Sequence, residues 1–229
     1  MSRPEADLAA LQDATDHLLE GLAALDDARV AGPSLLPGWT RGHVLAHVAR
    51  NADALVNVLN GRPMYTSTEA RDGDIDRNAP RSLADHRADV RDSAARLADA
   101  ADGLTDERWK STVTLRGGIT DRADTIPLRR WVEVELHHLD LDIGHTVADL
   151  SGAFTDRAVA YLTDRFAGRP GVPPVELRAE DGRVWRTGSG DGAPHVIVGT
   201  PPALVGWLSG RTSGSGLTAG APLPTLPPL

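Results

Sequence analysis

Two segments far apart in the sequence carry side chains that could bind one metal ion. Glu133 and His137 form a Glu-x-x-x-His motif, and residues four apart lie on the same face of a helix. Residues 36–52 contain two histidines, His43 and His47, also four apart. If the two predicted helices pack together, two imidazoles and one carboxylate can converge, which is the ligand set of a catalytic zinc ion with an open coordination position.

Spacing alone does not select the residues that face the protein interior. The predicted helix around the motif has two polar strips with apolar neighbours. A buried charged strip must be paired or metal-bound, but solvated or hydrogen-bonded surface residues would show the same periodicity. One strip contains Glu133, His137, Asp140 and Gly144, and the other contains Glu135, His138, Asp142 and His145.

The predicted helix that begins near Thr40 also leaves open which of its two histidines faces the interior. His43 falls in the first turn, where a side chain is expected near solvent, whereas His47 lies deeper and is followed one turn later by Asn51. Both histidines remain candidates on this reasoning.

Composition limits the class of protein. The 229 residues are 41% hydrophobic and 24% charged, which is typical of a globular protein with one or two domains. The net charge of −8 argues against a nucleic-acid partner and weakly against an anionic membrane. No apolar run is long enough to span a bilayer and the N-terminus lacks a signal core, so we expect a cytoplasmic protein. The chain has no cysteine, so any thiol at a metal must come from outside.

Apolar periodicity and capping residues predict a helical N-terminal half. Thr40 and Ser82 are plausible N-caps, and Gly61 and Pro63 end the second helix. The polar stretch 64–80 is interpreted as a long loop, and residues 106–119 as strand or loop. The predicted helices are Asp7–Val30, Thr40–Asn60, Leu83–Ala101 and Thr125–Gly144.

The C-terminal part has a different character. One further helix is predicted at Thr155–Phe166, a hairpin turns at residues 180–182, and His195–Gly199 resembles a third strand. A short helix at Pro201–Leu208 precedes an extended, Pro-rich tail. The expected fold class is therefore α+β, with a four-helix bundle at residues 1–152 and a small α/β domain at residues 153–229.

Four segments together resemble the mycothiol-dependent maleylpyruvate isomerase family, a branch of the DinB-like metal-binding bundles. They are the helix-two signature Leu36–Asn51, the following loop Pro63–Arg71, the motif segment Glu133–Leu141, and Trp207–Arg211 with the Pro-rich end. The resemblance covers essentially the whole chain in order. It implies zinc ligands at His47, Glu133 and His137 and a catalytic arginine at Arg211, whereas His43, Glu135 and His138 are not ligands in this mapping. It identifies no mycothiol-binding residues.

The resemblance also implies an activity. The expected reaction is the isomerisation of maleylpyruvate to fumarylpyruvate in the gentisate route of aromatic degradation, with zinc and mycothiol as cofactors. Reversible addition of a thiolate would turn a conjugated double bond into a freely rotating single bond. The partners would be a small dicarboxylate and a low-molecular-weight thiol, and the resemblance is compatible with a monomer.

The negative substrate requires local positive charge, and several residues could meet this need. Arg211 could stabilise the enolate or clamp a carboxylate. Arg50 and Arg71 are weaker candidates, and Asp140 could orient a ligand histidine. Two alternatives remain open: a mycothiol S-transferase acting on another electrophile, and a metal-binding module without catalytic activity.

Overall fold

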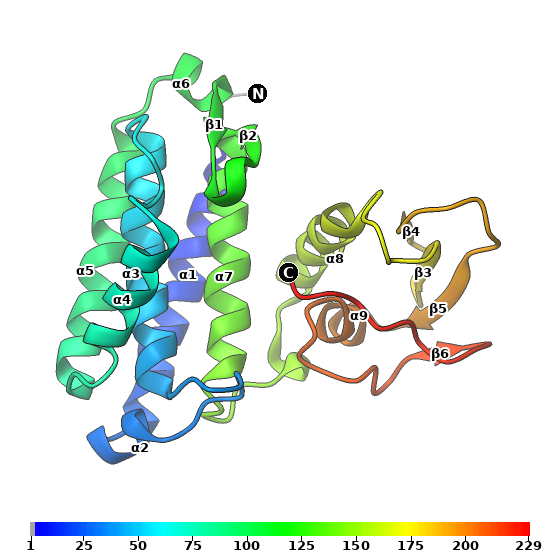
Figure 1. Ribbon diagram of the computed structural model, residues 1–229, viewed down its shortest axis with the longest axis horizontal. Helices are drawn as coiled ribbons and strands as arrows, with labels where there is room; N and C mark the ends of the chain where they lie inside the picture. Colours follow the sequence, from blue (N-terminus) through cyan, green and yellow to red (C-terminus); the bar gives the residue numbers. More distant parts are fainter. Residues whose placement is uncertain (1–2) are drawn as a thin grey trace. The chain divides into compact units, whose positions relative to one another are not determined.

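A computed structural model describes residues 3–229, which form two compact units that divide between His145 and Thr146 (Figure 1). The sequence-based boundary at 152/153 lies a few residues beyond this division. The mostly helical first unit and the small sheet of the second confirm the predicted fold class. Within residues 3–229, no helix combines the length and the apolar character that a membrane crossing requires.

Four long helices make the bundle of the first unit. α1 packs against α7 and α5, and α3 packs against the same two helices, so each helix has two neighbours (Figure 1). The predicted caps are present, because the hydroxyls of Thr40 and Ser82 accept hydrogen bonds from the backbone N–H groups of His43 and Asp85. The long helices are α1 (Glu5–Gly21), α3 (Arg41–Leu59), α5 (Leu83–Asp102) and α7 (Ile126–Asp140).

The predicted helix Asp7–Val30 is not continuous, which corrects the sequence-based prediction. α1 passes into the 3-10 turn η1 (Leu22–Ala24), and Leu25 adopts an extended conformation. Asp26 then caps a new short helix, α2 (Asp27–Ala31), by accepting from the N–H of Arg29 at 2.8 Å. The regular spacing of leucines continues through this break because Leu22 and Leu25 are both buried in the same core.

The predicted loop 64–80 was also wrong in part. Residues Thr68–Asn78 form helix α4, capped by Ser67, and α4 packs against α3. The helix buries only Ile75 and Asn78, so its sequence lacks the apolar repeat that would have indicated a helix.

The segment between α5 and α7 combines helix and strand. α6 (Asp106–Lys110) is followed by β1 (Thr112–Thr114) and β2 (Thr120–Arg122), with η2 (Arg116–Gly118) between the strands and η3 (Ala123–Thr125) after them. The two strands pair antiparallel, with Val113 opposite Asp121.

In the second unit, a four-stranded sheet has the order β4-β3-β5-β6. The predicted hairpin is β3–β4, and β5 pairs parallel to β3, with Leu177 opposite Ile197. Helices α8 and α9 pack against each other, and α8 contacts β4. The elements are η4 (Val147–Asp149), α8 (Gly152–Phe166), β3 (Val175–Ala179), β4 (Val184–Thr187), β5 (His195–Gly199), α9 (Pro201–Leu208) and β6 (Thr218–Ala219).

Candidate metal centre

His47, Glu133 and His137 converge where α3 packs against α7. The Oε2 atom of Glu133 lies 3.1 Å from Nε2 of His47 and 3.3 Å from Nε2 of His137. One potential ligand atom from each residue lies within 4.8 Å of the others. The two imidazole side chains are 8% and 11% exposed, whereas the Glu133 side chain is 39% exposed, so the cluster is walled by protein but accessible beside the carboxylate.

Two contacts, one on each side of the cluster, fix the register between α3 and α7. Arg41, in the first turn of α3, donates to the carbonyl oxygen of Leu141 just beyond α7. Further along both helices, Arg130 donates to Oδ1 of Asn51 at 2.9 Å. Because the cluster lies between these contacts along each helix, His47 and His137 are held opposite each other.

Asp140 orients His137, as the spacing suggested. Its Oδ2 atom lies 2.9 Å from Nδ1 of His137, so Nδ1–H donates to the carboxylate and Nε2 is directed toward Glu133. A carboxylate behind a histidine fixes its tautomer and increases its basicity as a metal ligand. The structure therefore directs Nε2 of His137 to the centre of the cluster.

The pKa values of His47 and Glu133 favour the forms that bind a metal ion. Burial lowers the pKa of His47 to about 4, so its imidazole is neutral at pH 7. Burial opposes the charge of Glu133, but hydrogen bonds from His137 and His47 outweigh burial and hold its pKa well below the ordinary value. Burial also opposes charge on His137, yet hydrogen bonds to Asp140 and Glu133 raise its pKa, so a metal ion at Nε2 would displace a proton from this ring. Two imidazoles around one carboxylate oxygen are donors that zinc accepts, so the residues fit such an ion.

His43 is placed differently from His47. Its Nδ1 atom accepts from the backbone N–H of Thr40 at 3.2 Å, which completes a capping box at the start of α3, and its Nε2 lies 3.7 Å from Asp76. The His43 ring is thus occupied at the end of the helix and does not join the cluster.

Of the three arginines named from the sequence, one contacts the cluster and two make contacts elsewhere. Arg71, in α4, donates to Nδ1 of His47 at 3.1 Å and lies over the ring of Tyr65. Arg50 instead pairs with Asp89 and Asp53. Arg211 follows α9 in the second unit, where it donates to the carbonyl oxygen of Ser209 at 2.7 Å.

Sequence reasoning missed Arg130. This arginine is 1% exposed and lies one helical turn before Glu133, and burial lowers its pKa to about 10, so it remains positively charged at pH 7. Its Nη2 atom is buried and has no hydrogen-bond partner within residues 3–229. A charged residue in a predicted helix is usually exposed, and the only sequence signal was Asn51 at a matching depth in α3.

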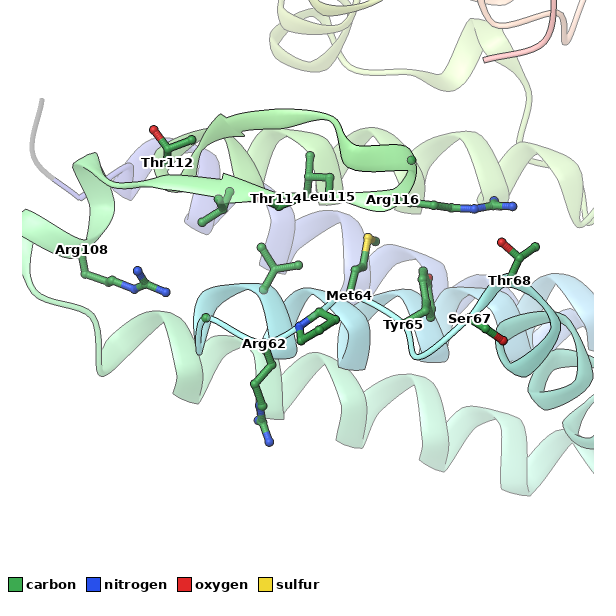
Figure 2. A pocket seen from close by; sticks show the side chains of 15 residues that line it. Arg62, Met64, Tyr65, Ser67, Thr68, Arg108, Thr112, Thr114, Leu115 and Arg116 are labelled. Carbon is green, nitrogen blue, oxygen red and sulfur yellow. The ribbon is translucent and has the colours of Figure 1, made fainter.

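A pocket of about 530 Å³ opens between the end of α3 and the β1–β2 hairpin (Figure 2). Arg108 and Arg116 line it on the hairpin side, while Met64, Tyr65 and Thr68 line it on the other side. Tyr65 belongs both to this pocket and to the contact with Arg71. Tyr65 therefore connects the pocket wall to Arg71, which contacts His47, and the pocket volume suits a small molecule.

The fold and the cluster define a helical-bundle protein with a candidate divalent-metal centre and a small C-terminal α/β unit. A family model described as the mycothiol maleylpyruvate isomerase N-terminal domain matches residues 11–142, and the model of the corresponding C-terminal domain matches residues 149–228. The chain therefore belongs to the mycothiol maleylpyruvate isomerase family.

Solved structures agree with this assignment. A crystal structure of mycothiol-dependent maleylpyruvate isomerase is 28% identical and superposes with a TM-score of 0.89, covering 100% of this chain and 99% of that chain. A histidine-to-alanine mutant of a mycothiol-dependent maleylpyruvate isomerase gives 27% identity and a TM-score of 0.88 with the same coverage. No curated protein sequence matches the chain.

Proposed function

We propose that this protein isomerises maleylpyruvate to fumarylpyruvate with mycothiol and zinc as cofactors, a reaction of gentisate degradation. The convergence of His47, Glu133 and His137 carries the proposal, together with the family match over both units. Zinc would supply a Lewis acid that favours the thiolate form of the bound thiol, and the thiol would supply the nucleophile that adds reversibly to the double bond.

The protein residues have three tasks in this reaction. His47, Glu133 and His137 would hold the metal, and Asp140 would keep Nε2 of His137 available to it. Buried helix packing on two sides of the cluster would exclude water from the reacting groups. Positive side chains would bind the dicarboxylate and stabilise the oxygen that gains charge when the thiolate adds.

Arg130 is the cation of the first unit that we expect to bind a substrate carboxylate, because its charge is buried beside Glu133. A buried guanidinium with an unused N–H group is costly unless an anion pairs with it, and a substrate carboxylate would satisfy it. Replacing Arg130 with Met is expected to raise KM for the dicarboxylate more than tenfold. Zinc content is measured in parallel, because Arg130→Met also removes the hydrogen bond to Asn51 that helps hold α3 against α7. Unchanged KM in the folded variant would remove Arg130 from the proposal.

Arg71 has a conditional role. A neutral imidazole has one N–H, so donation from Arg71 to Nδ1 places the His47 proton on Nε2, next to Glu133. When Nε2 binds a cation, the proton must lie on Nδ1, and Nη2 of Arg71 loses this acceptor while Nη1 keeps its contact with Asp72. Its guanidinium is then available to an anionic molecule in the pocket beside Tyr65.

Arg211 retains the role that the family resemblance implies. We propose that it acts on the substrate oxygen or carboxylate. Arg211→Ala is expected to lower turnover strongly without changing zinc content, and Arg211→Lys is expected to recover only part of the activity because it lacks the bidentate fork. Wild-type turnover in Arg211→Ala would contradict this role.

The activity is tested by incubating the zinc-loaded protein with maleylpyruvate, with and without mycothiol. We expect fumarylpyruvate to form only when mycothiol is present, with no net consumption of the thiol. The same assay with simple electrophiles tests the alternative function. If only mycothiol conjugates accumulate, the protein is an S-transferase; if zinc binds but neither reaction occurs, it is a binding module.

A further inference from the structure

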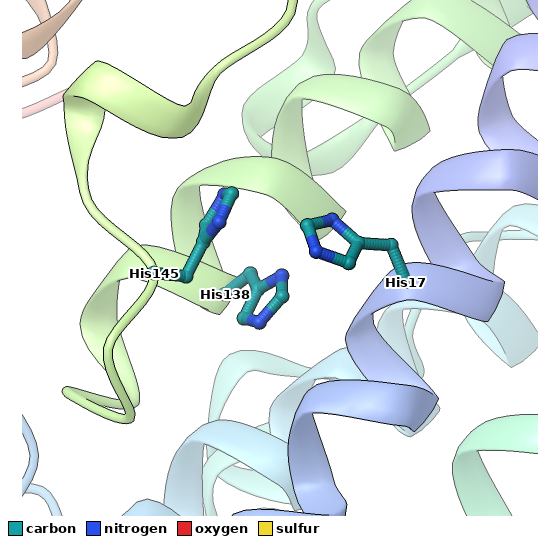
Figure 3. A group of neighbouring side chains, drawn as sticks. All are labelled: His17, His138 and His145. Atoms are coloured by element: carbon teal, nitrogen blue, oxygen red, sulfur yellow. The ribbon is translucent and has the colours of Figure 1, made fainter.

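A second group of histidines lies where α7 packs against α1, whereas the metal cluster lies where α7 packs against α3. His17 comes from α1, His138 from α7, and His145 from the segment that follows α7 (Figure 3). One ring nitrogen from each residue lies within 4.8 Å of the other two. Figure 3 shows the three rings directed toward one another from three different segments of the first unit.

The ring geometry resembles that of imidazoles around a common centre. The ring centre of His17 lies 5.0 Å from those of both His138 and His145, at steep interplanar angles of 72° and 88°. Two imidazoles bound to one zinc ion at tetrahedral angles have ring centres about 5 Å apart. His138 and His145 are closer, at 4.1 Å and nearly parallel, so one of them must turn slightly on binding. His145 lies in the segment between α7 and η4, outside both helices.

A carboxylate lies at the edge of the group. Glu135 Oε2 is 3.5 Å from Nε2 of His145, and Trp131 Nε1 lies 3.3 Å from the other carboxylate oxygen. The Nε2 atom of His145 is buried and makes no hydrogen bond to any of residues 3–229. The structure thus places a buried imidazole nitrogen between two other imidazoles and an oriented carboxylate.

The backbone of α1 makes room for this arrangement. Gly21 follows His17 by one helical turn, and a Cβ atom at this position would lie 2.7 Å from Nε2 of His138. A larger residue would push the His138 ring away from α1. The close approach of the three rings therefore depends on a glycine as well as on the histidines themselves.

We propose that His17, His138 and His145 form a second metal site, selective for a transition-metal ion such as Zn²⁺, with Glu135 as an oxygen donor at its edge. Imidazole-rich sites bind zinc, copper or nickel, whereas magnesium and calcium require mostly oxygen ligands. His17 is exposed, so the ion can enter from solvent without opening the bundle. A bound ion would join α1, the end of α7 and the following segment, and this role is independent of the proposed isomerase activity.

The test counts zinc ions on the full-length protein after removal of metal and titration with Zn²⁺, using native mass spectrometry and elemental analysis. We expect two ions on the wild-type protein, and one each on His47→Ala and His17→Ala. The variant with both substitutions should bind none. His195→Ala, which changes a half-buried histidine outside both groups, is the matched control and should retain two ions.

A thermal-unfolding experiment separates binding from folding defects. In the His47→Ala background, Zn²⁺ should raise Tm, and adding His17→Ala should abolish this increase without lowering Tm in the absence of metal. The proposal is overturned if His47→Ala binds no zinc, or if its ion is retained after His17→Ala. If only the primary site fails, the wild-type protein binds one ion that His47→Ala retains and His17→Ala loses.

Discussion

Two faces of the same helix present histidines to two different neighbours. Toward α3, His137 and His47 surround the carboxylate of Glu133; toward α1, His138 joins His17 and His145, with Glu135 at the edge. The first group has a central anion and an orienting carboxylate, Asp140, and the second has three imidazoles and an exposed member. This difference supports our proposal that the first group is the catalytic one, since its imidazoles are buried and oriented while its carboxylate is accessible. The second group suits a structural ion.

The comparison also answers the question that periodicity left open. α7 contacts both α1 and α3, and these partners are faced by residues from the two strips, Glu133, His137, Glu135 and His138. The predicted helix to Gly144 was too long, because α7 ends at Asp140. Neither strip is simply solvated. A helix between two neighbours has two inward-facing sides, and spacing within one helix cannot show which residues those neighbours contribute.

The largest expected effect is on kcat, and it should differ between substitutions in the two histidine groups. His47→Ala should reduce kcat for maleylpyruvate by about a thousandfold, because metal-assisted charge stabilisation supplies several kcal/mol. His17→Ala should leave kcat and KM within about twofold of wild type, since the two groups share no residue and His17 comes from α1. Steady-state kinetics with zinc and mycothiol provide the measurement. A similar loss of activity in both variants would show that the groups do not act separately.

The second prediction concerns the packing beside the first group. A Cβ atom on Gly42, in the first turn of α3, would overlap the backbone carbonyl of Ala79, directly after α4. Gly42→Ala should therefore lower the free energy of unfolding by about 1–3 kcal/mol through overpacking. It should also displace Arg71 on α4 from His47, while zinc binding at the second group persists.

Gly73→Ala is the matched control for this substitution. Gly73 lies within α4 and a Cβ there meets only the Arg77 side chain, at 3.6 Å. Alanine should stabilise the helix by up to about 1 kcal/mol. Urea denaturation of both variants gives the comparison, and equal effects would contradict the packing argument.

A smaller effect is expected from the residues that orient the histidines. Asp140→Asn should weaken zinc binding at the first group by about 10- to 100-fold, because the amide no longer fixes the tautomer of His137. Glu135→Gln, on the other strip, should weaken only the second group. Competition with a chelator of known affinity would measure both constants. If Asp140→Asn left the first constant unchanged, Asp140 would have no orienting role.

The smallest expected effect is a change in stability with pH. Burial lowers the pKa of His86, which lies 3.2 Å from the carbonyl oxygen of Ala79 and is influenced by Asp89 and Arg81. The unfolded chain therefore binds a proton near pH 6.5 while the folded chain does not. Stability is complete above this pH and declines as pH falls toward the folded pKa.

His86→Gln removes this contribution and retains an amide that can donate to Ala79. Between pH 7 and pH 5, the variant should lose less stability than the wild-type protein. Denaturant titrations at the two pH values provide the measurement. Equal losses in both proteins would show that His86 does not contribute to the pH dependence.

The sequence indicated those features that depend on local chemistry. Thr40 and Ser82 marked the beginnings of α3 and α5, and the Glu133–His137 spacing placed both side chains on one face. Helix α4 was missed because its partners, not its own pattern, stabilise it against α3. The break at Leu25 was hidden because buried leucines continue across it.

The remaining features of the site depend on tertiary packing. Nothing near Arg130 in the sequence indicates that it is buried beside Glu133, and His17 lies on an exposed part of α1. Both residues acquire their surroundings only when α7 packs between α1 and α3. Such contacts join residues far apart in sequence, which periodicity within a single helix does not record.

The most direct test of the account is X-ray diffraction from zinc-soaked crystals of this protein, with data collected on both sides of the zinc absorption edge. An anomalous peak is predicted within bonding distance of His47 Nε2, His137 Nε2 and the Glu133 carboxylate. Absence of a peak among these three residues in crystals that bind zinc elsewhere would contradict the central claim.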